Sequence, residues 1–222
     1  MSRTASARLK PAVAVRGVIL ALVLVCAVSV GAALHQSAAG ADRALPGSAA
    51  AQEPGPGAPA QGTADVVADG MVTEEDGVLP DGVTVFDGAH PGITRLSPDL
   101  LDALRRAAED ARRQGIVIHV NSGWRSPEYQ DELLHQAVSQ YGSEAEAARW
   151  VATAATSAHV AGEAVDIGSF DAVAWMSEHG DSYGLCQTYG NESWHFELRR
   201  DAIGGGCPAP YADPTEDPRM QG

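Results

Sequence analysis

Apolar positions in the second half of the chain recur with two different periods, which predict helices and strands. Stretches in which apolar residues recur every three to four positions are typical of helices with one buried face. Two of these stretches open with Ser-Pro, a pair suited to the N-cap and the first position of a helix. We expect four helices, from Pro98 to Gly115, from Pro127 to about Tyr141, from Glu144 to about Ala154 and from Phe170 to Glu178.

Short apolar runs between these helices predict strands. In the last of these runs, Trp194 to Leu198, apolar and polar residues alternate, so His195 and Glu197 lie on one face of the strand. We expect His195 to point from this face toward a functional site. Trp194, Phe196 and Leu198 lie on the other face and enter the core. Helices and strands mix without a βαβ repeat, so the fold class is α+β. The runs are Ile116 to Val120, Ala164 to Ile167, Leu185 to Tyr189 and Trp194 to Leu198, and the last two are close enough to pair as a hairpin.

The N-terminus combines basic residues with an uncharged stretch. Four Lys or Arg residues precede residues 17–34, which carry no charge. These 18 residues reach the lower bound for a membrane span. Basic residues before the stretch predict that the N-terminus stays inside and the remainder lies outside the membrane. We therefore expect residues 1–35 to be a signal-anchor, with a cleaved signal peptide as the alternative.

Composition divides the rest of the chain. Residues 36–70 are rich in Ala, Gly, Pro, Gln and Ser, which predicts a disordered linker. Residues 71–210 contain the predicted helices and strands and form one domain. Residues 211–222 contain Pro214 and Pro218, and we expect them to be a loose C-terminal tail.

Charge and cysteine usage narrow the function further. The chain has 15 basic and 29 acidic residues, a net charge of −14, and lacks a basic stripe with interleaved aromatic residues. This balance excludes the phosphate-neutralising surface of a nucleic-acid-binding protein. Cys26 lies in the N-terminal apolar stretch, and an exported location permits a disulfide between Cys186 and Cys207, although two free thiols are the alternative.

Three residues form a candidate metal site: His159, Asp166 and His195. Three protein ligands that leave one coordination position open are typical of a catalytic zinc. On a helix, His159 and Asp166 would lie about 10.5 Å apart, too far to share a metal with bonds of about 2 Å. The chain must therefore turn between them, and Gly162 allows such a turn. Glu192, three residues before His195, adds a second carboxylate.

These residues belong to three ordered motifs that resemble the signature of the VanY-type zinc D-alanyl-D-alanine carboxypeptidases. The resemblance covers roughly residues 80–200, and it is specific because all three motifs occur in the expected order. The motifs are Ser122-Gly123-Trp124-Arg125-Ser126, then Ser157-x-His159-x-x-Gly162-x-Ala164-x-Asp166, then Glu192-x-Trp194-His195.

The resemblance implies a fold, an activity and roles for residues. The implied fold is a small antiparallel sheet flanked by helices, like that of the hedgehog and DD-peptidase proteins. The implied activity is zinc-dependent release of the terminal D-Ala from peptidoglycan stem peptides by an extracytoplasmic enzyme, which we expect to be a monomer with one zinc ion. His159, Asp166 and His195 would bind the zinc, and Glu192 would act as the catalytic base. Arg125 would hold the terminal carboxylate of the substrate, and Ser157 would hydrogen-bond the ligand or the backbone.

Two departures from the family pattern keep alternatives open. Only Gly190-Asn191 separates Tyr189 from Glu192, and Ser193 stands where proline is common. The short loop favours, as an alternative, an endopeptidase that uses the same zinc site. A further alternative is a catalytically silent zinc-containing wall-binding module, but Glu192 argues against it because binding alone needs no base. We interpret Glu197 as a carboxylate outside the ligand set.

Overall fold

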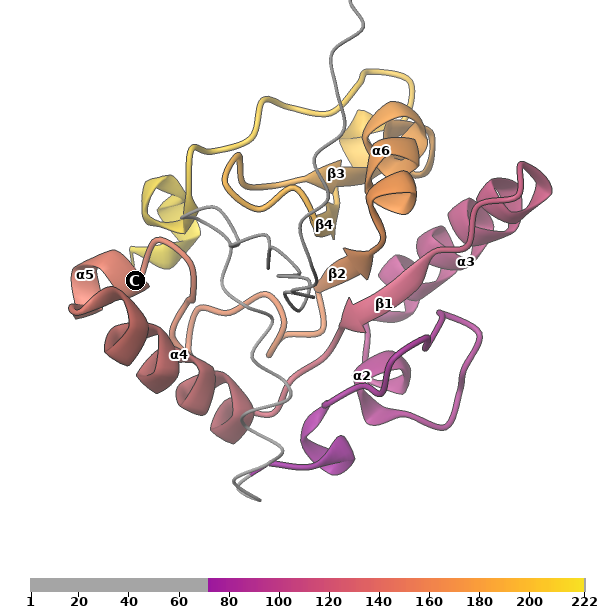
Figure 1. Cartoon of the computed structure of the whole chain (residues 1–222). Helices are drawn as coiled ribbons and strands as arrows, with labels where there is room; N and C mark the ends of the chain where they lie inside the picture. Colours follow the sequence, from indigo (N-terminus) through magenta and orange to yellow (C-terminus); the bar gives the residue numbers. More distant parts are fainter. Residues whose placement is uncertain (1–71, 222) are drawn as a thin grey trace, which may run out of the picture. The chain divides into compact units, whose positions relative to one another are not determined.

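The computed structural model describes residues 72–221 (Figure 1). The predicted N-terminal apolar stretch at 17–34 and the predicted linker at 36–70 lie outside these residues. Among residues 72–221, no helix combines the length and the apolar character needed to cross a membrane.

A four-stranded antiparallel sheet with the order β1-β2-β4-β3 organises the domain (Figure 1). The central strand β2 is buried along its whole length. Its residue Asp166 pairs with Ser122 of β1 on one side and with His195 of β4 on the other. The end of β1 and the start of β4 therefore meet beside Asp166, in the middle of β2. The strands are β1 (His119–Ser122), β2 (Ala164–Gly168), β3 (Leu185–Gln187) and β4 (His195–Leu198).

The α-helices lie on both sides of this sheet (Figure 1). Helices α3 and α6 pack against the face that carries Val165, Ile167 and Phe196, and together they enclose the main hydrophobic core. Because side chains alternate along a strand, Asp166 and His195 lie on the opposite face. The α-helices are α2 (Pro91–Thr94), α3 (Pro98–Arg113), α4 (Pro127–Tyr141), α5 (Glu144–Ala147) and α6 (Phe170–His179), and the 3-10 turns are η1 (Glu74–Asp76), η2 (Gly180–Tyr183), η3 (Arg200–Ala202), η4 (Pro214–Glu216) and η5 (Pro218–Met220).

The predicted α+β class, the antiparallel sheet and the hairpin of β3 and β4 are confirmed. Helices α3, α4 and α6 begin where the sequence predicted and end within one or two residues of the predicted ends. Ser126 caps α4 by accepting a hydrogen bond from the backbone N–H of Tyr129 at 3.0 Å. Ser97 occupies the N-cap position of α3, but its side chain makes no capping hydrogen bond.

Two predicted elements were placed wrongly. Helix α5 ends at Ala147 rather than near Ala154, because side chains from elsewhere capture the next carbonyl groups. Asn191 donates to the Arg149 carbonyl at 2.8 Å, and Gln130 donates to the Ala152 carbonyl at 2.9 Å. Strand β1 begins at His119 rather than Ile116. The Ile116 N–H donates a hydrogen bond to the Ala111 carbonyl at the end of α3, so it does not pair with a neighbouring strand.

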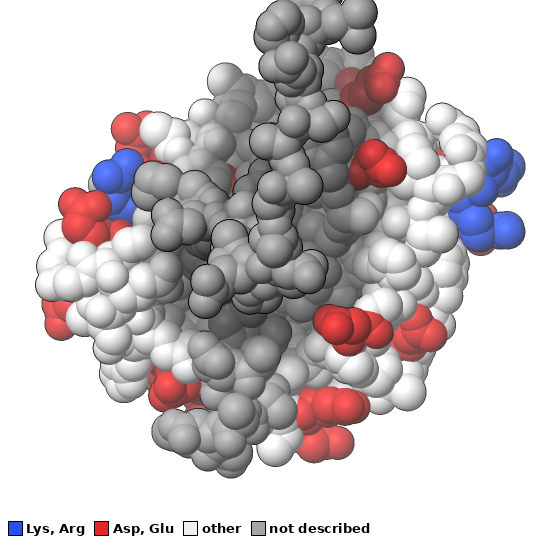
Figure 2. Space-filling view, viewed as in Figure 1, with Lys and Arg blue, Asp and Glu red and all other residues white. Residues whose placement is uncertain are grey.

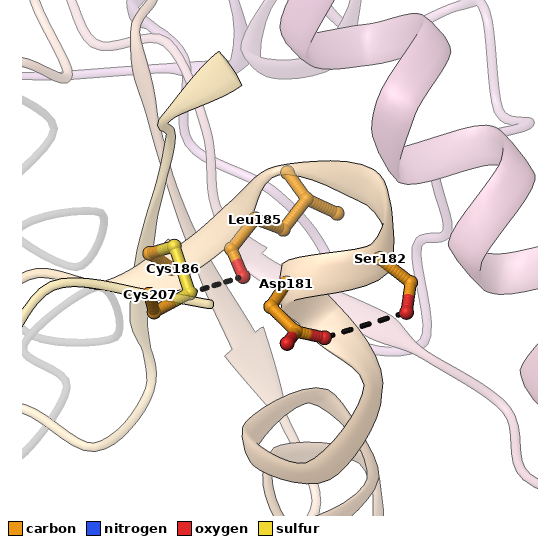
Figure 3. The surroundings of a disulfide bond; sticks show 5 residues. All are labelled: Asp181, Ser182, Leu185, Cys186 and Cys207. Atoms are coloured by element: carbon orange, nitrogen blue, oxygen red, sulfur yellow. Dashed lines mark hydrogen bonds between the residues drawn. A yellow bond between two sulfur atoms is a disulfide. The ribbon is translucent and has the colours of Figure 1, made fainter. Parts of the chain in front are cut away.

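The predicted disulfide between Cys186 and Cys207 is present, with a Cα–Cα distance of 5.6 Å (Figure 3). It joins β3 to the chain that follows η3. Sγ of Cys207 lies 3.7 Å from the carbonyl oxygen of Leu185. A disulfide sulfur carries no hydrogen, so this is a packing contact that seats the bridge against β3.

The residues that follow the disulfide differ from the predicted loose tail. We call Tyr211–Gln221 the C-terminal segment. It contains η4 and η5, and Asp213 and Asp217 cap these turns with buried side chains. Pro214 and Pro218 occupy the first positions of the turns, where their missing N–H is not needed. The prolines therefore start short helical turns instead of preventing structure.

Candidate metal centre and its cleft

The three predicted ligands come from neighbouring parts of the sheet face. Asp166 lies in the middle of β2, and His195 is the first residue of β4. His159 lies in the turns that precede β2. The predicted turn at Gly162 is confirmed, because its φ is 72° and a Cβ atom there would lie 2.5 Å from the carbonyl oxygen of Arg95. Only glycine fits this close approach, which brings His159 back over Asp166.

The ligand atoms of these residues lie close together. His159 Nε2 lies 3.4 Å from Asp166 Oδ1, and His195 Nδ1 lies 3.1 Å from the same oxygen. The two ring nitrogens are 3.2 Å apart. All three residues are buried, and their ligand atoms fall within 4.8 Å of one another. The arrangement can hold one metal ion with two nitrogen ligands and one oxygen ligand.

Hydrogen bonds on the far side of each imidazole set its orientation. His159 Nδ1 lies 2.8 Å from the carbonyl oxygen of Gly123, which can only accept, so Nδ1 carries the proton. His195 Nε2 lies 3.3 Å from Oε1 of Glu197. These contacts leave Nε2 of His159 and Nδ1 of His195 directed at Asp166. Such partners are what metal-bound histidines use to fix their tautomer, so the donor set fits a metal.

The charges around the site favour a cation. Burial and the Arg125 guanidinium lower the pKa of His159, which keeps its imidazole neutral. Although burial opposes it, the two histidines and Arg125 hold the pKa of Asp166 well below its usual range. Burial likewise opposes a charge on His195, but hydrogen bonds to Asp166 and Glu197 raise its pKa to about 10. The carboxylates that attract a proton to His195 would also attract a metal ion.

Glu192 supplies a second carboxyl group beside the ligands. Its Oε2 lies 3.8 Å from His195 Nδ1, and its Oε1 is buried with no hydrogen-bond partner among residues 72–221. Burial, helped by the nearby Asp166 charge, raises the pKa of Glu192 to about 7. A carboxyl group with such a pKa can accept and return a proton near neutral pH.

Arg125 lies in the loop between β1 and α4, as predicted, and all its nitrogens have protein partners. Nε donates to Ser122 Oγ at 2.7 Å, and Nη1 donates to Gln130 Oε1 at 3.1 Å. Nη2 donates to Asp166 Oδ2 at 2.7 Å. The guanidinium is therefore held rigidly beside the ligand carboxylate.

Ser157 is buried at the edge of the same site, and its hydroxyl accepts a hydrogen bond from the Val160 N–H at 3.4 Å. The sequence left open whether Ser157 hydrogen-bonds a ligand or the backbone, and this contact is to the backbone. The side chain also borders the cleft, so it lies where a ligand could reach it.

A cleft opens over the metal site, and α4 forms much of its apolar wall. Trp194 borders this cleft and does not enter the core, so the prediction for this residue was wrong. It lies in a turn before β4 begins, where strand alternation does not apply. Phe196 does enter the core, as predicted. Other lining residues include Tyr129, Leu133, Ala137, Trp150, Pro214 and Met220.

Glu197 is buried and lies outside the ligand set, as its predicted role requires. Besides His195 it contacts Arg199 at 3.0 Å and Arg219, whose Nη1 donates at 2.7 Å. Neither Arg219 nor the packing of Tyr189 on the His195 ring was predicted from the sequence. Arg219 lies outside the three motifs, so only its closeness to Glu197 in the folded structure could identify it.

The visible surface charge agrees with the charge balance of the chain. On the face shown in Figure 2, acidic side chains are more widespread than basic ones over the described residues. This distribution matches a net charge of −14 and supports the exclusion of nucleic acid as a partner.

Comparisons with known proteins find similarity to one family. Residues 93–199 match the family model described as VanY, D-alanyl-D-alanine carboxypeptidase. A D-alanyl-D-alanine carboxypeptidase from Enterococcus faecalis (strain ATCC 700802 / V583) is 31% identical over 127 residues. That alignment covers 46% of this chain and 46% of the relative, so the chain spans about half the length of the curated relative.

Solved structures give weaker likenesses. A VanY D,D-pentapeptidase from a VanB-type resistance cassette, solved in complex with Zn(II), is 26% identical with a TM-score of 0.46, covering 50% of this chain and 75% of that chain. The LD-carboxypeptidase LdcB is 24% identical with a TM-score of 0.47, covering 60% of this chain and 73% of that chain.

Proposed function

We propose that the chain is a zinc-dependent D,D-carboxypeptidase that removes the terminal D-Ala from peptidoglycan stem peptides, because residues 93–199 match the VanY family model. The observation that carries the proposal is the buried cluster of His159, Asp166 and His195 with Glu192 beside it. A silent wall-binding module would have no use for a buried carboxyl group poised beside three ligands.

In this proposal His159, Asp166 and His195 hold one zinc ion. When bound, the ion supplies Lewis-acid chemistry that polarises the scissile carbonyl and makes water a stronger acid. Glu192 takes a proton from the attacking water and later gives it to the leaving amine. Its pKa of about 7 suits both transfers.

Arg125 gives the enzyme its preference for the end of a peptide. A guanidinium has about five N–H donors, and Ser122, Gln130 and Asp166 each accept one from Arg125. One donor therefore remains on each terminal nitrogen, enough for a two-pronged contact with a carboxylate. An internal peptide bond offers no carboxylate at this position, so the contact selects a chain terminus.

The location of the substrate sets the location of the enzyme. Peptidoglycan lies outside the cytoplasmic membrane, so the domain acts there, and we propose that it acts as a monomer. The apolar stretch at 17–34 would anchor it or direct its secretion, and residues 36–70 would act as a tether. A tether of about 35 residues has a root-mean-square reach of roughly 30 to 35 Å, which would carry the domain off the membrane and into the wall.

Incubating the zinc-loaded full chain with a muropeptide pentapeptide, followed by mass analysis of the products, tests the proposal. Release of free D-Ala together with a product one residue shorter is the expected result. Cleavage at an internal bond of a cross-linked muropeptide, with no release of D-Ala, would instead identify an endopeptidase. Binding without any cleavage would identify a wall-binding module.

A further inference from the structure

The C-terminal segment reaches the metal site although it lies beyond the family-matched residues 93–199. The disulfide at Cys207 ties the chain to β3 shortly before this segment begins. The backbone of Tyr211 then pairs with Tyr189 in a parallel bridge. In Figure 1 the segment, in yellow, returns to the side of the domain where α5 lies.

Arg219 makes the most direct link to a ligand. Its Nη1 and Nη2 donate to the two oxygens of Glu197, at 2.7 and 3.1 Å. Glu197 is only 3% exposed, and its Oε1 faces Nε2 of His195. A buried carboxylate needs compensating positive charge. Arg199 and Arg219 both supply it, and Arg219 does so in the two-pronged geometry that best fixes a carboxylate plane.

Asp217 makes a second link, through Tyr189. It is 1% exposed, accepts a hydrogen bond from the Tyr189 hydroxyl at 3.1 Å and also holds Nε of Arg219 at 3.0 Å. The Tyr189 ring packs against the imidazole of His195, with centroids 5.1 Å apart. The segment therefore holds His195 both by its Nε2 atom and by its ring face.

The same segment also supports the loop that carries Glu192. The N–H groups of Gly190 and Asn191 donate to the carbonyls of Tyr211 and Ala212, at 2.7 and 3.2 Å. These contacts fix the short loop immediately before Glu192. The C-terminal segment thus contacts Glu197 and Tyr189, which support His195. It also contacts the loop that supports Glu192.

We propose that Arg219 is a positioning residue for the metal centre: through Glu197 it fixes the imidazole of His195 with Nδ1 directed at the metal. The proposal deepens the proposed function and rests on its ligand set. Arg219 contacts none of the three proposed ligands directly, and its shortest link to His195 runs through Glu197.

The test measures zinc affinity, which does not depend on knowing the substrate. Apo full chain carrying Arg219→Gln competes with a chromophoric chelator for zinc, beside the wild type. Loss of a partner that orients a metal ligand typically costs about 10- to 100-fold in metal affinity, and we expect a loss in that range. Wild-type affinity in a folded Arg219→Gln chain would overturn the proposal.

Arg200→Gln is the matched control. Arg200 is an exposed arginine that pairs with Asp99, away from Glu197. It should bind zinc as the wild type does. An equal loss of affinity in Arg200→Gln would show that removing any arginine has this effect, and would also overturn the proposal.

Two further variants keep the test decisive. If Arg219→Gln does not fold, Arg219→Lys retains the charge but not the two-pronged contact, and should show a smaller loss than the range above; no loss would overturn the proposal. A double-mutant cycle with Glu197→Gln should be non-additive, because both changes act through one contact. Additive losses would mean that Arg219 does not act through Glu197. A chain that binds zinc as expected but releases no D-Ala would refute the activity while leaving this proposal intact.

Discussion

His159 and His195 offer different ring nitrogens to the same point, and each choice follows from what the other nitrogen contacts. The Gly123 carbonyl accepts a hydrogen bond from the Nδ1–H of His159, and Glu197 accepts one from the Nε2–H of His195. One contact is to the backbone and cannot be mutated away, whereas the other depends on a side chain. At the scale of single residues, His195 is therefore the proposed ligand whose orientation can be changed by substitution.

Glu192 has a different role from the ligands, and a substitution can separate the two. Glu192→Gln should keep about one zinc per chain, because His159, Asp166 and His195 are unchanged. Turnover should fall by about 10²- to 10⁴-fold, the usual contribution of a positioned base. Metal analysis and the initial rate of D-Ala release measure the two effects, and near-normal turnover would refute the base role.

Arg125 can be tested from the side of the substrate. If it binds the terminal carboxylate, amidating that carboxylate should be as damaging as Arg125→Ala. Losing one charge-assisted contact costs about 1.5 to 3 kcal/mol, or about 10- to 150-fold in kcat/KM. The two changes should be non-additive, because each removes one partner of a single interaction.

The pairing of Arg125 with Asp166 makes one control necessary. Arg125→Ala leaves a ligand carboxylate without its partner, so zinc content must be measured in the variant before its rate is interpreted. Amidation changes only the substrate and leaves the protein unchanged, so it tests the contact more directly than Arg125→Ala does. A wild-type enzyme indifferent to amidation would favour the endopeptidase.

At the scale of elements, the sequence predicted what local chemistry determines. Ser-Pro pairs mark the starts of α3 and α4, and alternation identified the faces of β4, because those signals lie within a few residues of the element. The overlong prediction for α5 failed because Asn191 and Gln130 compete for its carbonyls from distant positions. The ligand set was predictable from motifs, whereas Arg219 meets Glu197 through contacts that no local pattern records.

The turn at Gly162 is an element whose geometry can be tested. Gly162→Ala adds a Cβ that would lie 2.5 Å from the Arg95 carbonyl, in a residue with φ of 72°. A left-handed non-glycine residue costs about 1 to 2 kcal/mol by itself, and the clash adds to that. We expect a lower Tm and weaker zinc binding, because the turn positions His159.

Gly115→Ala is the matched control for this turn. Gly115 also has a left-handed φ, 81°, but an added Cβ would meet nothing within 4 Å. It should therefore show only the backbone cost, with unchanged zinc affinity. Equal losses of stability in the two variants, measured by thermal unfolding, would mean that the Arg95 contact does not matter.

At the scale of the whole molecule, the disulfide joins the sheet, at β3, to the chain that leads to the C-terminal segment. The sheet carries Asp166 and His195 of the proposed ligand set, and the C-terminal segment supports His195 and the loop before Glu192. The bridge thus connects the fold of the family-matched residues to contacts that lie beyond them.

Opening the bridge should therefore affect both stability and the metal centre. In the chain-entropy model, a loop of this size stabilises by about 3 kcal/mol, so the Cys186→Ala/Cys207→Ala variant should unfold at lower denaturant concentration. Its zinc affinity should also fall, since the C-terminal segment loses its nearest covalent anchor. Lowered stability with unchanged zinc affinity would limit the role of the bridge to the fold. It would also leave Arg219 and Asp217 as sufficient anchors of the C-terminal segment at the metal site.

The bridge itself can be tested by thiol labelling. In a Cys26→Ser background, which removes the third cysteine, the folded chain should show no reactive thiol until it is reduced. Prompt labelling of two thiols in the untreated chain would contradict the bridge.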